Sequence, residues 1–241
     1  MMKKIIHKAT ERGHANHGWL NAKHSFSFAS WYNPDKVHFG ALRVLNDDEV
    51  AQGMGFGKHP HDNMEIITLV QEGSLAHSDN MGNGSTMKPN DVQVMSAGKG
   101  VTHSEMNPDK NNAVKLFQIW VIPNKRDVTP RYDQKTFAPE LRKNKWQEII
   151  KPDTQQEGDA IFIHQQAWFN LTDLDENKEI IYTNKLKGNG AYVFVIAGDI
   201  EVSGENLSAR DAIGVTDYET ITIKANTNAR ILVMDLPMIE L

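Results

Sequence analysis

Short runs of apolar and β-branched residues, separated by glycine, proline, asparagine or aspartate, recur along the chain. This pattern predicts short β-strands, because β-branched and aromatic side chains favour extended backbone and turn residues interrupt it. The predicted strands are 65–71, 92–97, 114–122, 160–166, 191–198, 219–225 and 229–236. Helical periodicity is poor. The best helix candidate is 138–150, although its second half could equally begin a strand. Many short strands with regular turn signals predict an all-β sandwich or barrel.

A weak internal repeat divides the chain into two similar parts. Residues 69–80, LVQEGSLAHSDN, resemble residues 194–205, FVIAGDIEVSGE, and each copy has a glycine at the strand end, Gly73 or Gly198. An aspartate-containing turn follows in both copies. Tandem repeats of one supersecondary unit predict two similar β-domains. We expect an N-terminal domain over 1–135 and a C-terminal domain over 136–241, joined through the polar stretch 123–158.

Composition narrows the class of protein. The chain has 241 residues and a formal net charge of −5, without the basic stripe that a nucleic-acid-binding surface requires. It contains no cysteine, which excludes disulfides, thiolate metal ligands and cysteine nucleophiles. The first residues lack the apolar core of a signal peptide, and no apolar run approaches the roughly 20 residues that span a membrane. We therefore expect a cytoplasmic protein without nucleic-acid or membrane partners.

Two pairs of alternating residues suggest a metal site. In HPHDNMEI, His59 and His61 share one face of a strand, because successive side chains point to opposite faces. In GVTHSEMN, His103 and Glu105 have the same alternation. If the two strands are neighbours, three imidazoles and one carboxylate meet. Such a ligand set suits iron or manganese, whereas structural zinc sites usually recruit cysteine.

Other interpretations of these residues stay open at this point. An isolated H-x-H pair is more often a surface feature than a site, and the second pair about forty residues later is what favours a metal centre. Strict alternation also puts Glu65 on the face of His59 and His61. The carboxylate ligand could therefore be Glu65 or Glu105.

The same residues match the two motifs of the cupin superfamily. The first motif is matched by Gly53, His59, His61, Glu65 and Gly73, and the second by Pro89, Asp91, His103 and Asn107, with Asp91 in place of a glycine. Within the cupins the chain resembles the pirin family, and among pirins the bacterial quercetin 2,3-dioxygenases. The resemblance is dense over residues 10–135 and is carried by ERGHANHGWLNAKHSFSFASWYNP, GFGKHPHDNMEIITLVQEG, MSAGKGVTHSEMNP and LFQIWVIP.

The resemblance implies a bicupin, in which two β-sandwich barrels pack face to face. It implies one metal ion per chain, in the N-terminal barrel only, with four ligands: His59, His61, His103 and Glu105. Iron(II) is the expected metal, and copper, manganese, nickel, cobalt and zinc are alternatives. Glu65 would then orient an imidazole or lie at the barrel mouth. The positions that correspond to the four ligands in the second repeat are Asn184, Leu186, Ile223 and Ala225, which cannot form this site.

The resemblance also implies a reaction. Pirin-like quercetin 2,3-dioxygenases open the central ring of a flavonol with O₂ and release carbon monoxide, and Glu105 would be the catalytic base that accepts the substrate's proton. The alternative is a redox-sensing partner of a transcriptional regulator or metabolic enzyme. We expect a monomer, because the two barrels cover each other's apolar faces.

The remaining histidines and methionines near the motifs are expected to have structural roles. His14, His17 and His24 alternate with Trp19, Phe26, Phe28 and Trp31, which suggests a cover over the rim of the first barrel. His77 follows the Gly73 turn and is expected in solvent. His164 is expected to be structural. The methionines expected to fill the pocket wall or core are Met54, Met64, Met95 and Met106.

Overall fold

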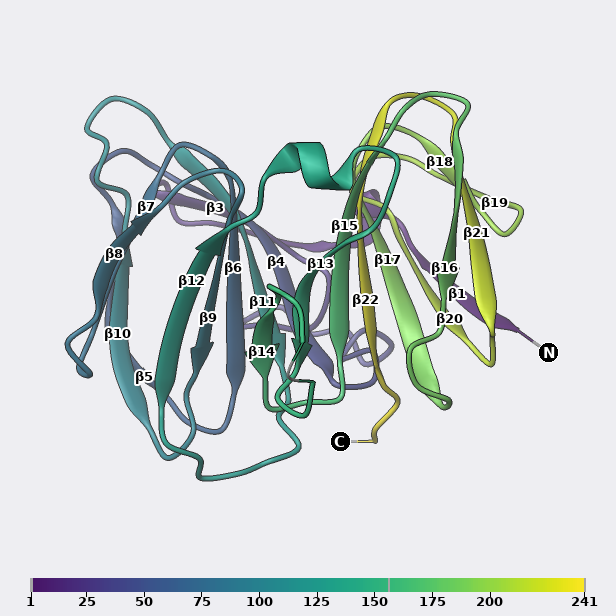
Figure 1. Ribbon diagram of the computed structural model, residues 1–241. Helices are drawn as coiled ribbons and strands as arrows, with labels where there is room; N and C mark the ends of the chain where they lie inside the picture. Colours follow the sequence, from purple (N-terminus) through teal and green to yellow (C-terminus); the bar gives the residue numbers. More distant parts are fainter. Residues whose placement is uncertain (1, 156, 241) are drawn as a thin grey trace.

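The structure is a computed structural model that describes residues 2–155 and 157–240. These residues form β-strands in two lobes, with two 3₁₀ helices, η1 (Ala9–Glu11) and η2 (Pro139–Arg142) (Figure 1). Among the described residues, no helix has the length and apolar character needed to cross a membrane.

The first lobe is a barrel of two sheets. Its seven-stranded sheet contains, in spatial order, β12 (Arg131–Thr136), β9 (Asp91–Ser96), β6 (Glu65–Glu72), β11 (Val114–Val121), β4 (Leu42–Val50), β3 (Leu20–His24) and β2 (Gly13–Asn16). Its four-stranded sheet contains β5 (Gly55–His61), β10 (Val101–Met106), β7 (Leu75–Asp79) and β8 (Gly84–Met87).

The second lobe repeats this plan. Its seven-stranded sheet contains, in spatial order, β1 (Lys3–His7), β20 (Ala212–Thr216), β17 (Asn189–Ala197), β22 (Ala229–Pro237), β15 (Trp168–Leu174), β13 (Gln147–Pro152) and β14 (Ile161–Ile163). Its four-stranded sheet contains β16 (Glu179–Thr183), β21 (Thr220–Ala225), β18 (Ile200–Val202) and β19 (Glu205–Leu207). The predicted all-β bicupin is therefore the observed fold.

The limits of the two expected domains, 1–135 and 136–241, remain a prediction. Two strands, β1 and β12, contain residues that pair in the lobe on the other side of these limits. Strand β1 belongs to the N-terminal part of the chain, yet it pairs with β20 of the second lobe, with Ile5 opposite Gly214. Strand β12 continues to Thr136 and pairs with β9 of the first lobe.

All seven predicted strands are confirmed, whereas the helix expected over 138–150 is wrong. Pro139 opens one 3₁₀ turn, and Asn144 has a positive φ of 54° that interrupts any continuing helix. Arg142 is buried and donates a hydrogen bond to Asp173 at 2.8 Å, which holds the turn against β15. The strand alternative for the second half is the one observed, as β13.

The internal repeat is confirmed by its turns. Gly73 ends β6 with φ 76°, and Gly198 ends β17 with φ 82°, in the left-handed region that glycine tolerates best. Asp91 and Asp211 then close equivalent turns, because each carboxylate accepts the backbone N–H three residues earlier, that of Lys88 or Ser208.

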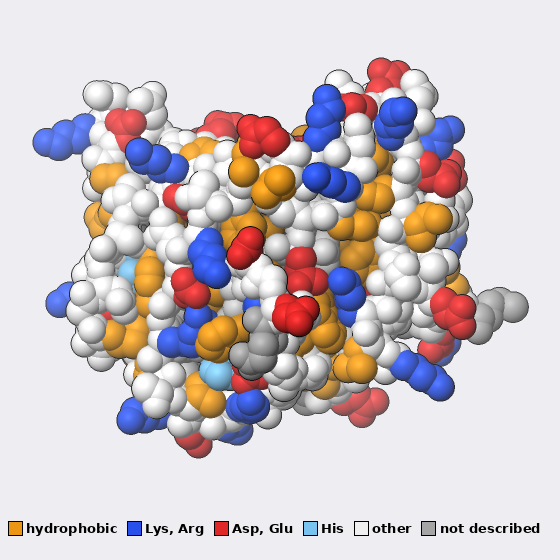
Figure 2. All heavy atoms as spheres, viewed as in Figure 1, with side chains coloured by type: hydrophobic (Ala, Val, Ile, Leu, Met, Phe, Trp, Pro, Cys, Tyr) orange, Lys and Arg blue, Asp and Glu red, His pale blue; other side chains and the backbone are white. Residues whose placement is uncertain are grey.

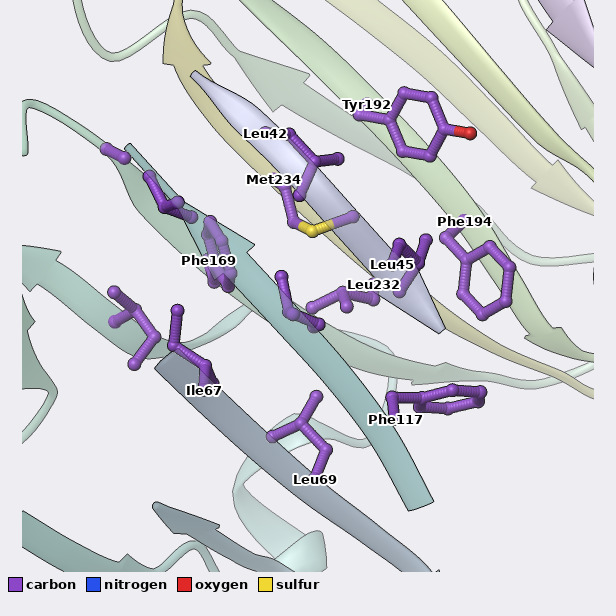
Figure 3. Packing of buried hydrophobic residues seen from close by; sticks show 14 of the residues in the cluster. Leu42, Leu45, Ile67, Leu69, Phe117, Phe169, Tyr192, Phe194, Leu232 and Met234 are labelled. Atoms are coloured by element: carbon purple, nitrogen blue, oxygen red, sulfur yellow. The ribbon is translucent and has the colours of Figure 1, made fainter. Parts of the chain in front are cut away.

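The two seven-stranded sheets pack face to face and share one apolar core. Figure 3 shows side chains of both lobes meeting there, among them Phe117 on β11 and Phe194 on β17. Their ring centroids are 5.3 Å apart in an edge-to-face arrangement. A separate, continuous apolar cluster fills the interior of the second barrel and includes Ile223 and Ala225.

The interior of the first barrel is different. Its apolar residues form two separate clusters, around Leu116 and around Met95, and polar side chains lie between them. The outer face seen in Figure 2, in contrast, shows no comparable concentration of one kind of polar group among the described residues, because charged side chains of both signs are intermixed there. The polar interior of the first barrel is therefore the feature that calls for a chemical explanation.

Candidate metal centre

Strands β5 and β10 are antiparallel neighbours, and their register sets His59 directly opposite His103. Ring centroids are 4.4 Å apart for His59 and His103, 4.8 Å for His59 and His61, and 4.9 Å for His61 and His103. One potential ligand atom of each histidine lies within 4.8 Å of the others. The alternation on each strand thus brings three imidazoles to one point inside the barrel.

The electrostatics of these histidines suit a cation. Burial, together with the neighbouring histidines, lowers the pKa of His61 to about 4 and that of His103 to about 3. Neutral imidazoles keep the lone pairs that bind metals. His59 Nδ1 lies 2.7 Å from the carbonyl oxygen of Gly57, to which it can donate its proton, and this leaves Nε2 as the free lone pair.

A buried atom without a partner tests whether these residues fit a metal. His103 Nε2 is inaccessible to solvent and has no hydrogen-bond partner among the described residues. Such buried polar atoms are rare in native proteins, because each costs desolvation free energy that nothing offsets. A metal ion is the partner that neutral imidazole nitrogens favour, so the donor set fits a divalent cation.

Glu105 is also buried, but it lies to one side of the three histidines. Its two carboxylate oxygens accept hydrogen bonds from Gln118 Nε2 at 2.9 and 2.7 Å, and Thr68 Oγ1 donates at 3.4 Å. Burial outweighs these hydrogen bonds and raises the pKa of Glu105 to about 7. Its ligand atom groups within 4.8 Å with those of His77 and His103. The four residues that the resemblance implied therefore belong to two overlapping groups, which share His103.

The prediction that Glu65 shares the face of His59 and His61 is wrong. The chain turns between β5 and β6, where Asn63 has a positive φ of 43°, so the alternation restarts in β6. Glu65 then accepts a hydrogen bond from Ser96 at 2.7 Å, its cross-strand partner on β9. It shares a sheet face with Ile67, which packs in the core between the lobes.

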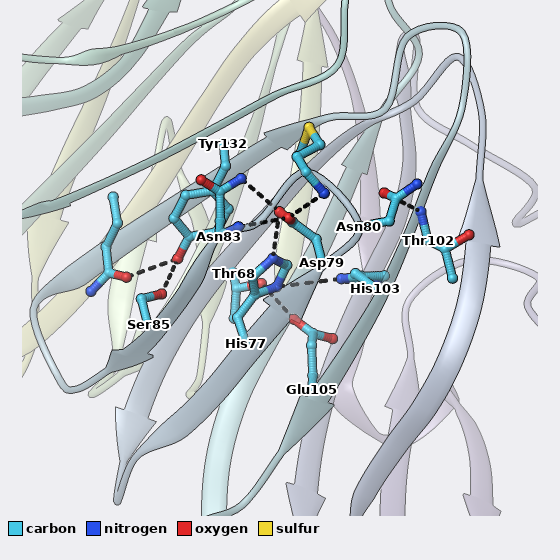
Figure 4. A network of polar contacts seen from close by, with 12 residues as sticks. Thr68, His77, Asp79, Asn80, Asn83, Ser85, Thr102, His103, Glu105 and Tyr132 are labelled. Atoms are coloured by element: carbon cyan, nitrogen blue, oxygen red, sulfur yellow. Dashed lines mark hydrogen bonds and ion pairs between the residues drawn. The ribbon is translucent and has the colours of Figure 1, made fainter.

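The expectation that His77 lies in solvent is wrong as well. It lies on β7 with its side chain fully buried, 3.2 Å from Asp79 and 3.4 Å from His103 (Figure 4). Burial lowers the pKa of His77, although Asp79 opposes this effect. A signal was present in the sequence, because Leu75, His77 and Asp79 alternate just as the residues of β5 and β10 do.

The three histidines line a cavity of about 230 Å³. Its apolar walls include Phe28, Phe56, Ile66 and Trp120. His61 stacks edge-on against Trp120 at 5.0 Å, and Trp120 contacts Phe28 in the same way at 5.4 Å. The cavity thus has three histidines that could hold a metal at one end and flat aromatic surfaces beside them, which suits a planar ligand.

The chain resembles known proteins in both sequence and structure. The family described as Pirin matches residues 6–121, and that described as quercetinase C-terminal cupin domain matches residues 149–236. The Escherichia coli (strain K12) protein named quercetin 2,3-dioxygenase is 39% identical over 236 residues, which cover 96% of this chain and 98% of the relative. The chain belongs to the pirin family.

Other pirins extend the likeness to structure. A pirin-like protein of Caulobacter vibrioides is 40% identical over 223 residues, covering 92% of this chain and 95% of the relative. The crystal structure of YhhW from E. coli superposes with a TM-score of 0.93 at 36% identity, covering 99% of this chain and all of that chain. A crystal structure of the bacterial pirin YhhW in complex with nickel(II) gives 0.92 at 37% identity, covering 98% and 100%.

The N-terminal segment of this pirin is part of the barrel instead of a cover over its rim. Strand β2 is the edge strand of the large sheet, and β3 lies between β2 and β4 and pairs with both. His24 is buried in the cavity wall, with Nδ1 2.9 Å from Asn46 Oδ1. His14 is exposed and contacts Asn21 at 2.8 Å, and His17 is also exposed.

The expected structural residues of the pirin divide into two kinds. His164 is held by Asp153, with Nδ1 2.9 Å from Oδ2, as a structural residue would be. Met95 is fully buried and Met64 packs against the same cluster. The expectation is wrong for Met54 and Met106, which are exposed on the surface.

One cavity residue was not found from the sequence. Asp48 lies on β4, lines the cavity and is buried, and its Oδ1 has no hydrogen-bond partner among the described residues. Burial, together with the nearby carboxyls of Asp47 and Glu105, raises its pKa to about 8. In sequence Asp48 stands in the acidic run NDDE, typical of a solvated loop, so only the strand pairing distinguishes it from its neighbours.

Proposed function

We propose that this pirin is a metal-dependent dioxygenase that cleaves the central ring of flavonols such as quercetin and releases carbon monoxide. The observation that carries the proposal is the unpartnered Nε2 of His103. It is buried beside His59 and His61, in the wall of a cavity that aromatic side chains also line. The relatives named quercetin 2,3-dioxygenase support the choice of substrate class. The apolar aromatic walls of the cavity support chemistry that must limit the access of water.

The proposed ligands are His59, His61, His103 and Glu105, and iron(II) is the proposed metal, with copper, manganese, nickel, cobalt and zinc as alternatives. A divalent metal bound there would lower the pKa of a coordinating hydroxyl and stabilise its anion. In the overall reaction both atoms of O₂ enter the ring-opened product, and one ring carbon leaves as carbon monoxide.

The chain's own residues would bind and orient the flavonol and accept its proton. Phe28, Phe56 and Trp120 offer surfaces on which a planar ring system can stack. Glu105 is the proposed proton acceptor, because burial raises its pKa to about 7 and a base works best when its pKa is near the working pH. Gln118 holds that carboxylate in place through its amide.

The test combines a binding step with a product measurement. Protein loaded with iron(II), or with each alternative metal in turn, is mixed with quercetin without oxygen, and the flavonol's absorption is expected to shift as its hydroxyl ionises. Admission of air should then release carbon monoxide in proportion to the substrate consumed. Absence of carbon monoxide with every metal would refute the proposal.

A matched pair of variants assigns the reaction to the site. His103→Ala should lose both the spectral shift and carbon monoxide release, because it removes the imidazole shared by both ligand groups. His164→Ala removes a histidine of the second barrel that is bound to Asp153 and should retain both. Equal activity in the two variants would place the reaction elsewhere.

A further inference from the structure

His77 and Asp79 lie behind His103, on the side away from His59 and His61. Strand β10 lies between β5 and β7, and Asp79 is the cross-strand partner of His103 on the side opposite His59. His77 is likewise the partner of Glu105. The side chains of His77 and Asp79 are both fully buried. Figure 4 shows Asp79, His77 and His103 in a continuous row of polar contacts.

The hydrogen bonds of Asp79 define its role as an acceptor. Its Oδ1 accepts the backbone N–H groups of Met81 at 2.9 Å and Asn83 at 3.0 Å, and backbone N–H groups can only donate. Its Oδ2 accepts the side-chain amide of Asn83 at 2.9 Å and lies 3.2 Å from His77 Nε2. A carboxylate held in this way needs a donor at His77 Nε2.

This donor settles the positions of the protons along the row. A neutral imidazole carries one N–H, so His77 with its proton on Nε2 presents a lone pair at Nδ1. His77 Nδ1 lies 3.4 Å from His103 Nδ1, and one of these two atoms must donate. The donor must be His103 Nδ1. Its other nitrogen, Nε2, is then the lone pair, and this is the buried atom without a partner.

We propose that Asp79, acting through His77, sets the tautomer of His103 so that Nε2 is permanently available to the metal. The inference rests on the proposed metal site and adds two positioning residues to it. His59 reaches the same state by donating Nδ1–H directly to the Gly57 carbonyl. Hydrogen-bond partners of this kind orient metal-binding imidazoles and strengthen their binding.

The same nitrogen atoms could instead bind the metal ion directly, and the test must distinguish that arrangement from the tautomer proposal. His77, His103 and Glu105 also have ligand atoms within 4.8 Å of one another, so an ion could bind between the two Nδ1 atoms. In that arrangement His77 would be a ligand itself. That arrangement also requires the proton of His77 on Nε2, because Nδ1 would hold the ion, so only replacements of His77 separate the two arrangements.

Asp79→Asn tests whether Asp79 sets the proton positions of this row, because the structure dictates how the new amide must lie. The two backbone N–H groups require an oxygen at the Oδ1 position, so the NH₂ group takes the Oδ2 position and faces His77 Nε2. The side-chain amide of Asn83, which donates to Oδ2 in the wild type, then turns over to present its oxygen. His77 must then carry its proton on Nδ1 and donate to His103. That places the proton of His103 on Nε2, where it blocks the metal.

We expect Asp79→Asn to weaken cobalt(II) binding by about 10- to 100-fold, measured by competition with a chromophoric chelator without oxygen. The matched control is Asp109→Asn. Asp109 closes a similar turn, with Oδ1 accepting the N–H groups of Asn111 and Asn112 and Oδ2 accepting the Asn112 amide, but it contacts no histidine among the described residues. Its cobalt affinity should equal that of the wild type.

Two replacements of His77 add a readout that a purely structural role would not produce. His77→Gln offers an oxygen to His103 Nδ1–H and an N–H to Asp79, so it should keep an affinity close to wild type. His77→Leu offers neither and should bind as weakly as Asp79→Asn. If His77 were a ligand, glutamine would fail as leucine does, and this result would overturn the proposal.

The remaining outcomes are also decisive. Wild-type affinity in a folded Asp79→Asn protein would overturn the tautomer proposal while leaving the metal site and the proposed function intact. Failure of the wild type itself to bind any of the metals would instead remove the proposed function. If Asp79→Asn does not fold, the comparison of His77→Gln with His77→Leu decides alone.

Discussion

Asp48 places a carboxyl group inside the first barrel, where its Oδ1 is buried without a hydrogen bond among the described residues. Burial raises its pKa to about 8 from an ordinary value of 3.8. Between these two values the unfolded chain releases the proton and the folded, metal-free protein keeps it. The unfolded state then binds fewer protons, so the free energy of unfolding decreases as the pH rises through this window.

Asp48→Asn should remove this loss and stabilise the metal-free protein at neutral and alkaline pH. The gain in unfolding free energy over wild type should grow by roughly 1 kcal/mol per pH unit between about pH 5 and 8 and then level off. Urea unfolding of both proteins across this range measures it. Asp35→Asn, at an exposed position, serves as control. A gain that does not depend on pH would contradict the assignment of Asp48.

The residues of the site differ in how far sequence could place them. His59, His61 and His103 could be brought together because alternation within a strand is a fixed property of the backbone. His77 obeys the same rule, but its strand lies behind a glycine turn, and a polar run after a turn is equally typical of solvent. Which carboxyl is buried depends on strand register, as Asp47 and Asp48 demonstrate. Asp48 faces the cavity, and Asp47 bonds to Arg12 and Arg210.

At the scale of elements, the two glycine turns around β18 allow a comparison. Gly198 and Gly204 both have positive φ, 82° and 88°. A Cβ on Gly198 would lie 2.3 Å from the carbonyl oxygen of Asn228, whereas nothing lies within 4 Å of one on Gly204. Gly204→Ala should therefore cost only the backbone strain, roughly 1 kcal/mol. Gly198→Ala should cost several kcal/mol, because a backbone group must also move.

Thermal unfolding of the two variants measures this difference directly. Gly198→Ala should lower the melting temperature clearly more than Gly204→Ala. Equal losses would mean that the contact with Asn228 is not part of the rigid turn. Gly73 is the equivalent of Gly198 in the first repeat, and its Cβ position is also close to backbone, 3.0 Å from the Ala113 carbonyl oxygen. Gly73→Ala, measured in the same way, therefore tests the internal repeat.

The seven predicted strands could be found because β-branched runs bounded by turn residues have one dominant interpretation. Their partners could be predicted only within each repeat. Strand β1, with the sequence KKIIH, has no alternation of polar and apolar residues that would assign it to either lobe. Its place beside β20 comes from long-range contacts such as the 2.9 Å contact between His7 Nδ1 and the Tyr192 hydroxyl. The 3₁₀ turn η2 was missed for a similar reason, because Arg142 bonds to residues distant in sequence.

At the scale of the whole molecule, the two barrels have the same strand plan but opposite interiors. The second is filled by one apolar cluster, while the first is divided by buried polar groups and a cavity. Buried polar groups and empty space reduce stability. We infer that the core between the two large sheets supports the first barrel and allows it to keep its site.

Phe194→Ala tests this dependence, because Phe194 belongs to the second barrel and packs edge-on against Phe117 of the first. Removing a fully buried phenylalanine should lower the free energy of unfolding by about 3–5 kcal/mol. If the shared core joins the barrels into one cooperative unit, hydrogen exchange should accelerate by similar factors in β11 and in β17. Ile181→Ala, at a position 55% exposed on β16, should change neither strand appreciably. Faster exchange in β17 alone would show that the first barrel is stable by itself.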